Sequence, residues 1–180
     1  MKRTAALLVL AFAVAAIAAG SAGSATSKSS FAVFVAPTVT AASNGLTLGT
    51  EMSGSFNVAA KTATGGGSYS LMAGSTVLET GTFTLGQRLV AFQFYGCGEV
   101  TMEGERIPLP PDFCGGRVIF VVHATSSTGV HHDGLLEVNC QIHDPGGQAP
   151  PGTSEGVKVN ARGINFNKHI TGDNLIQMLP

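Results

Sequence analysis

The chain has 180 residues, of which 44 % are apolar and 12 % charged, and its formal net charge is −1. No run of Lys or Arg occurs, which argues against nucleic acid and anionic membrane surfaces as partners, because both require clustered positive charge. Trp is absent and Tyr occurs only as Tyr69 and Tyr95, so a sugar-binding platform of exposed aromatic rings is disfavoured.

The N-terminal residues have the pattern of a secretory signal peptide. Met1-Lys2-Arg3 is positive, residues 5–19 are apolar and rich in alanine, and small residues follow up to Ala25. This apolar run of about fifteen residues is shorter than the ~20 that a bilayer requires, and no later segment is long enough for a membrane span. We place the cleavage after Ala25, with Ala19 and Ala22 as alternatives. The sequence therefore predicts a secreted or periplasmic protein, with a signal peptide at 1–25 and a flexible leader at 26–30.

Residues 31–180 are predicted to form a single all-β domain. Short segments of alternating apolar and polar residues recur, separated by Gly, Asn, Asp and Pro. This spacing favours a single antiparallel β-sandwich or β-barrel of about eight to ten short strands. Gly65-Gly66-Gly67 is predicted to be a hairpin or linker, and the Pro-containing segments 96–115 and 144–153 are predicted loops. The predicted strands are 32–39, 46–51, 54–61, 67–73, 76–85, 89–95, 116–124, 135–142, 156–161 and 175–179.

Three cysteines allow one disulfide in an oxidising compartment. Cys97 ends one predicted strand and Cys114 precedes the next, so a bridge between them would close the loop, worth about 3 kcal/mol in the chain-entropy model. The Cys97–Cys140 and Cys114–Cys140 pairings remain as alternatives. Cys140 occupies a core-facing position on its strand, where a thiol usually behaves as a small apolar side chain.

A hairpin connects the strands 116–124 and 135–142, and its register decides which histidines meet. Centring the turn on Ser127 would place Arg117 opposite Glu137, and His123 opposite His131. In that register His123 and His131 could share a metal ion, with Asp133 as a possible third ligand. The alternative is that these are ordinary solvated turn histidines.

The sequence has no recognisable catalytic motif. Neither a Gly-x-Ser-x-Gly elbow nor His-Glu-x-x-His occurs, and no cofactor is expected. Glu99, Glu103 and Glu105 fit a solvated acidic loop better than a paired-carboxylate site. The leading hypothesis is a non-catalytic secreted β-domain that binds or scaffolds an unidentified ligand or protein.

Two alternatives to this hypothesis remain. The first is a small-ligand-binding barrel, or a barrel enzyme of the cyclase or isomerase kind, whose cavity carries a few polar groups such as Tyr95, Glu137 or a histidine. The second is an extracytoplasmic metal-binding protein that uses His123 and His131.

Overall fold

A computed structural model describes residues 29–102, 105–142 and 154–180, and within these ranges every regular element is a β-strand. No helix in this part of the chain is long and apolar enough to cross a membrane. The strands are β1 (Ser30–Ala42), β2 (Leu46–Asn57), β3 (Thr62–Ala73), β4 (Thr76–Cys97), β5 (Glu99–Met102), β6 (Glu105–Pro108), β7 (Phe113–Ser126), β8 (His131–Cys140), β9 (Gly156–Ala161), β10 (Ile164–Thr171) and β11 (Asn174–Met178). The all-β prediction is confirmed.

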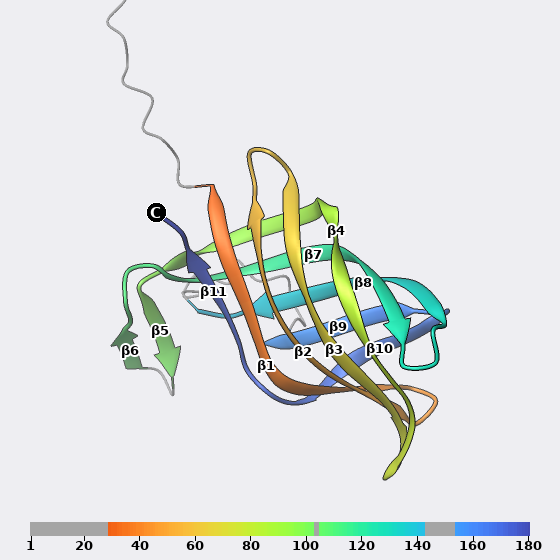
Figure 1. Cartoon of the computed structure of the whole chain (residues 1–180). Coiled ribbons are helices and arrows are strands. Elements are labelled where there is room, and N and C mark those ends of the chain that lie inside the picture. Colours follow the sequence, from red (N-terminus) through yellow and green to blue (C-terminus); the bar gives the residue numbers. More distant parts are fainter. Residues whose placement is uncertain (1–28, 103–104, 143–153) are drawn as a thin grey trace, which may run out of the picture.

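The main sheet is antiparallel and closes on itself as a barrel. Neighbouring strands pair in the order β1, β2, β3, β4, β7, β8, β9 and β10, and β10 pairs again with β1. β10 and β11 behave as one bent strand, because β10 pairs with residues 39–42 of β1 and β11 pairs with residues 31–35. In Figure 1, β1, β2 and β3 cross in front of β7, β8 and β9.

The interior of the barrel is filled by alternate residues of its strands. At the end where β1 begins, four phenylalanines pack together. The rings of Phe31 and Phe56 are stacked with centroids 5.3 Å apart, and Phe56 meets Phe92 at 4.9 Å and Phe120 at 5.8 Å edge to face. Full burial of one such side chain contributes roughly 1.5–3 kcal/mol. The packing of these side chains therefore stabilises the association of β1, β2, β4 and β7 at this end of the barrel.

Several predicted strands are joined or extended in the structure. The segments 46–51 and 54–57 belong to the single strand β2, whereas 58–61, predicted as the end of a strand, form the turn to β3. The segments 76–85 and 89–95 both belong to β4. β4 remains one strand although Gly86, Gln87 and Arg88 interrupt the predicted pattern. Its pairing with β7 is irregular between Leu85 and Leu89, and this irregularity accommodates the three residues. The prediction missed β10, and the predicted loop 96–115 contains the two-stranded β5–β6 hairpin.

The prediction that Gly65-Gly66-Gly67 forms a hairpin or linker was wrong. These glycines lie within β3 and are paired with β2. A Cβ atom on Gly67 would lie 1.9 Å from the Glu51 carbonyl oxygen, and one on Gly66 would lie 2.3 Å from the Phe83 carbonyl oxygen. The glycine run therefore permits close approach of three strands rather than a turn.

The predicted register of the β7–β8 hairpin was also wrong, by two positions. Ser126 donates its N–H to the Val130 carbonyl, and Gly129 has a φ of 83°. A three-residue loop closed by a left-handed glycine therefore connects the strands, and it places His123 opposite Asp133 instead of His131.

The predicted faces of both strands survive this change, because a two-residue shift preserves the alternation. All six residues predicted to face the core are buried: Val118, Phe120, Val122, Leu136, Val138 and Cys140.

The predicted disulfide between Cys97 and Cys114 is confirmed. The two cysteines are directly opposite each other on β4 and β7, and their Cα atoms are 3.9 Å apart. Cys140 is free and buried, as predicted. Burial raises the pKa of its thiol to about 11, so the thiolate is disfavoured at neutral pH.

Two residues of the predicted leader, Ser29 and Ser30, contact the rest of the fold. Ser30 begins β1, and the Asn57 side chain donates to the hydroxyls of both Ser29 and Ser30. These two residues are thus part of the fold. The predicted signal peptide, residues 26–28, Glu103 and the loop 144–153 lie outside the described residues.

Candidate functional site

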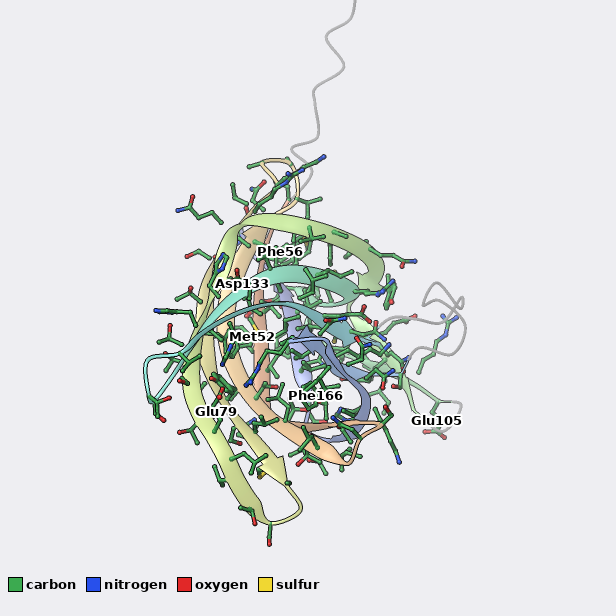
Figure 2. All side chains as sticks on the ribbon, turned by 90° about the vertical axis from the view of Figure 1, so that its right-hand side faces the viewer. Met52, Phe56, Glu79, Glu105, Asp133 and Phe166 are labelled. Carbon is green, nitrogen blue, oxygen red and sulfur yellow. A yellow bond between two sulfur atoms is a disulfide. The ribbon has the colours of Figure 1, made fainter. Side chains whose placement is uncertain are left out.

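An apolar cavity of about 70 Å³ lies inside the barrel. One water molecule needs roughly 10–15 Å³, so the cavity has room for about five water-sized groups. The cavity extends to the surface, because Arg162, whose side chain is 51 % exposed, also lines it. Its apolar wall includes Leu48, Leu71, Phe83, Val122, Leu136 and Phe166. Figure 2 labels three lining residues from different strands, Glu79 of β4, Asp133 of β8 and Phe166 of β10.

A cluster of four polar side chains borders this cavity, with Glu79 at its centre. Tyr69 donates its hydroxyl to Glu79 Oε1 over 2.7 Å. Arg162 Nη1 lies 3.3 Å from Glu79 Oε2, and His132 Nε2 lies 3.2 Å from Glu79 Oε1. Three strands and one turn therefore bring a carboxylate, a phenol, an imidazole and a guanidinium to one place.

Strand alternation explains why Glu79 and His132 point toward the cavity. Glu79 shares the inward face of β4 with Phe83 and Leu85, and His132 shares the inward face of β8 with Leu136. Tyr69 is opposite Gly81, where an added Cβ would lie 2.7 Å from the tyrosine ring. Gly81 thus leaves the space that the Tyr69 ring occupies.

Arg162 reaches the cluster from the two-residue turn between β9 and β10. Both turn residues have positive φ, 55° at Arg162 and 74° at Gly163. Such turns favour Asn-Gly, because Asn tolerates the left-handed conformation better than a long side chain does. Arginine is therefore a locally unfavourable choice here, and its ion pair with Glu79 suggests a role at the cavity.

The electrostatics of the cluster leave hydrogen-bonding capacity for a ligand. Burial and the hydrogen bond to Glu79 raise the pKa of Tyr69 to about 12, so its hydroxyl stays protonated as a donor. His132 Nε2 is buried, and although it is close to Glu79 it has no hydrogen-bond partner among the described residues.

Thr50 supplies a second unsatisfied group to the same cavity. This residue is only 6 % exposed, and its hydroxyl oxygen has no partner in the described part of the chain. Buried polar groups are nearly always hydrogen-bonded, so two unsatisfied atoms at one cavity indicate a place for a ligand or water.

The histidines singled out by the sequence lie elsewhere. His123 Nδ1 is 2.7 Å from Asp133 Oδ1, on exposed positions of β7 and β8. His131 Nδ1 is instead 3.1 Å from the Thr125 hydroxyl. Across the described residues, no group of three or more His, Cys, Asp or Glu side chains is arranged to hold a metal ion.

The other polar groups suggested for a barrel cavity do not line it. Tyr95 donates to Asn139, and Glu137 accepts a 2.6 Å bond from Arg117 and pairs with Lys158 at 3.4 Å. Arg117 and Glu137 thus lie side by side, as predicted, but as diagonal neighbours rather than directly opposite.

Sequence reasoning missed all four residues of the cluster. The signal for Glu79 and His132 was present, because each precedes by four residues, on the same strand, an apolar residue that faces the core, Phe83 and Leu136. Comparison of the chain with models of known protein families, with characterised proteins and with solved structures finds no match. The geometry of the site is therefore the basis for assigning a function.

Proposed function

We propose that this protein binds a small, largely apolar molecule with one hydrogen-bond-accepting group, such as a carbonyl, in the barrel cavity. The observation that carries the proposal is the pair of buried, unsatisfied polar groups, His132 Nε2 and the Thr50 hydroxyl, at the wall of an otherwise apolar cavity. Ligand sites combine such apolar walls with a few placed polar groups.

The charges of the cluster favour a neutral ligand. Glu79 and Arg162 pair with each other, so neither charge requires a counter-ion from the ligand. Tyr69 already donates to Glu79. The groups that remain are an imidazole N–H in the Nε2 tautomer and a threonine hydroxyl, and both can donate a hydrogen bond to an accepting oxygen.

The size of the cavity supports a ligand, or the buried end of one, of about six non-hydrogen atoms. Ligand efficiencies range from about 1.5 kcal/mol per atom for the best small ligands to about 0.3 for larger ones. At about 0.8 kcal/mol per atom, six atoms give roughly 5 kcal/mol, which corresponds to a Kd on the order of 0.1–1 mM.

Cyclopentanone, cyclopentanol and methylcyclopentane, each of six non-hydrogen atoms, test this proposal by ligand-observed NMR. Cyclopentanone should bind with a submillimolar to millimolar Kd, and methylcyclopentane should bind more weakly because it leaves both polar atoms unsatisfied.

Ala124→Leu, which places a larger side chain on the cavity wall, should abolish binding. Ala73→Leu, at an exposed position of β3, is the matched control and should leave it unchanged. Equal binding by the wild type and Ala124→Leu would contradict the proposal.

We also propose that the protein works outside the cytoplasm. The Cys97–Cys114 bridge is compatible with an oxidising compartment, and the N-terminal pattern of residues 1–25 supports export.

A further inference from the structure

We infer that the barrel cavity catalyses a proton-transfer isomerisation, which converts a small β,γ-unsaturated ketone into its conjugated α,β-isomer with Glu79 as the base. This inference rests on the proposed binding of a carbonyl compound in the same cavity. It adds a reaction to that binding, and the reaction uses only side chains of this chain.

Glu79 has the placement that a general base requires. Its side chain lines the cavity and is only 21 % exposed, so little water competes with a bound molecule for the carboxylate. Tyr69 contacts one carboxylate oxygen and Arg162 the other, and these contacts fix the orientation of the group. An ionised carboxylate has about four acceptor positions, so at least one remains to take a proton from a bound ligand.

His132 has the placement that an oxyanion donor requires. Its Nε2 is buried at the cavity wall, 3.2 Å from the Glu79 carboxylate, without a hydrogen-bond partner in the described residues. A ketone whose oxygen accepts from this nitrogen would present its neighbouring carbon close to Glu79. The same N–H would then stabilise the negative charge that develops on the oxygen.

The reaction balances without a further reactant. Glu79 removes a proton from the carbon between the carbonyl and the double bond, and the electron pair of that C–H bond delocalises onto the ketone oxygen. The resulting dienolate accepts a hydrogen bond from His132. Protonated Glu79 then gives the same proton to the far carbon of the former double bond, which forms a new C–H bond and the conjugated ketone. In a five-membered ring one carboxylate can reach both carbons.

The carboxylate at this position has two roles that a neutral amide cannot fill. It pairs with Arg162 over 3.3 Å, which offsets the cost of placing a charge at the cavity wall. It can also take a proton from a bound ligand, because an ionised carboxylate is a base and a neutral amide is not.

The test uses 3-cyclopenten-1-one, whose conversion to 2-cyclopenten-1-one is followed by the ultraviolet absorbance of the conjugated product. The wild type should accelerate the conversion over buffer, and Glu79→Gln should lose about 100-fold or more of that acceleration, the usual contribution of a general base. His132→Gln should lower the rate as well. Glu51→Gln is the matched control, because Glu51 is an exposed carboxylate on β2 that accepts from Ser68 and does not line the cavity.

Binding of cyclopentanone, measured on the same proteins, separates this inference from the proposed function. Glu79→Gln should retain a Kd within about threefold of the wild type, because the hydrogen-bond donors to the ligand remain. Binding without acceleration by the wild type, or equal rates for the wild type and Glu79→Gln, would overturn the inference and leave the binding proposal intact. Absence of binding would overturn both.

Discussion

Loss of the Cys97–Cys114 disulfide should destabilise the fold by about 3 kcal/mol. The bridge closes a loop with a sequence separation of 17. The chain-entropy model gives about 3 kcal/mol for a loop of this length, because the bridge restricts the unfolded chain. The two cysteines are paired on adjacent strands, so the folded geometry does not depend on the bridge for its hydrogen bonds.

Urea unfolding of the wild type and of the Cys97→Ala/Cys114→Ala variant measures this effect. With an m-value of about 2 kcal/mol per molar urea, a loss of 3 kcal/mol lowers the midpoint by roughly 1.5 M. A reducing agent that does not absorb at the detection wavelength should produce a similar shift in the wild type and none in the double variant.

Cys140→Ala separates the Cys97–Cys114 bridge from both alternative pairings, because each alternative uses Cys140. Because Cys140 is free, this variant should keep the full sensitivity to reductant. Loss of that sensitivity would show that Cys140 forms the native bridge. A wild-type midpoint unchanged by reductant would refute the reasoning about the loop.

Four further predictions follow from other parts of the molecule. Arg162→Asn should change the free energy of unfolding by less than about 0.5 kcal/mol, because a better turn residue offsets the loss of a partly exposed ion pair. It should weaken cyclopentanone binding in NMR titrations, because the shorter side chain removes part of the cavity wall. Gly67→Ala should destabilise the fold by more than about 2 kcal/mol in urea unfolding, since its Cβ would overlap a backbone oxygen. Burial alone would raise the pKa of the Glu137 carboxyl, but Arg117 and Lys158 outweigh it and lower this pKa below 4.5. The stabilisation by ionised Glu137 is therefore present above pH 4.5 and is lost as the pH falls through the lowered pKa. The stability gap between the wild type and Glu137→Gln should therefore be larger at pH 7 than at pH 3, and an equal gap would contradict this. Mass spectrometry of exported protein should find a chain that begins near Thr26, whereas a mature product that retains the N-terminal methionine would contradict export.

Strand faces could be predicted from the sequence, whereas strand pairing could be predicted only in part. Alternation alone places Phe120 and Leu136 in the core, and both are buried. The register of the same hairpin depends on whether Gly129 closes a three-residue loop, which the residue pattern does not decide.

Closure of the barrel was not visible in the sequence. β10 has three large apolar residues in phase, Ile164, Phe166 and Ile170, but the charged Lys168 interrupts their alternation. Its pairing with β1 joins segments more than a hundred residues apart, and no local pattern encodes such a contact.

The candidate site was missed for a related reason. The sequence draws attention to His123 and His131 because they flank a turn, whereas His132, between His131 and Asp133, faces the cavity. Glu79 lies on a strand predicted correctly as 76–85, but its partners come from β3, β8 and the β9–β10 turn. Only the closed barrel brings them together.

A small carbonyl compound that binds at the cavity lined by His132 and Glu79 should contact the His132 imidazole. An NMR titration with cyclopentanone, following the imidazole nitrogen resonances of all histidines in the uniformly labelled protein, tests this contact. We expect a saturable shift at His132 and none at His131, which lies on the outer side of the same strand. A shift at His131 alone, or no shift at His132 when the ligand is bound, would contradict this contact.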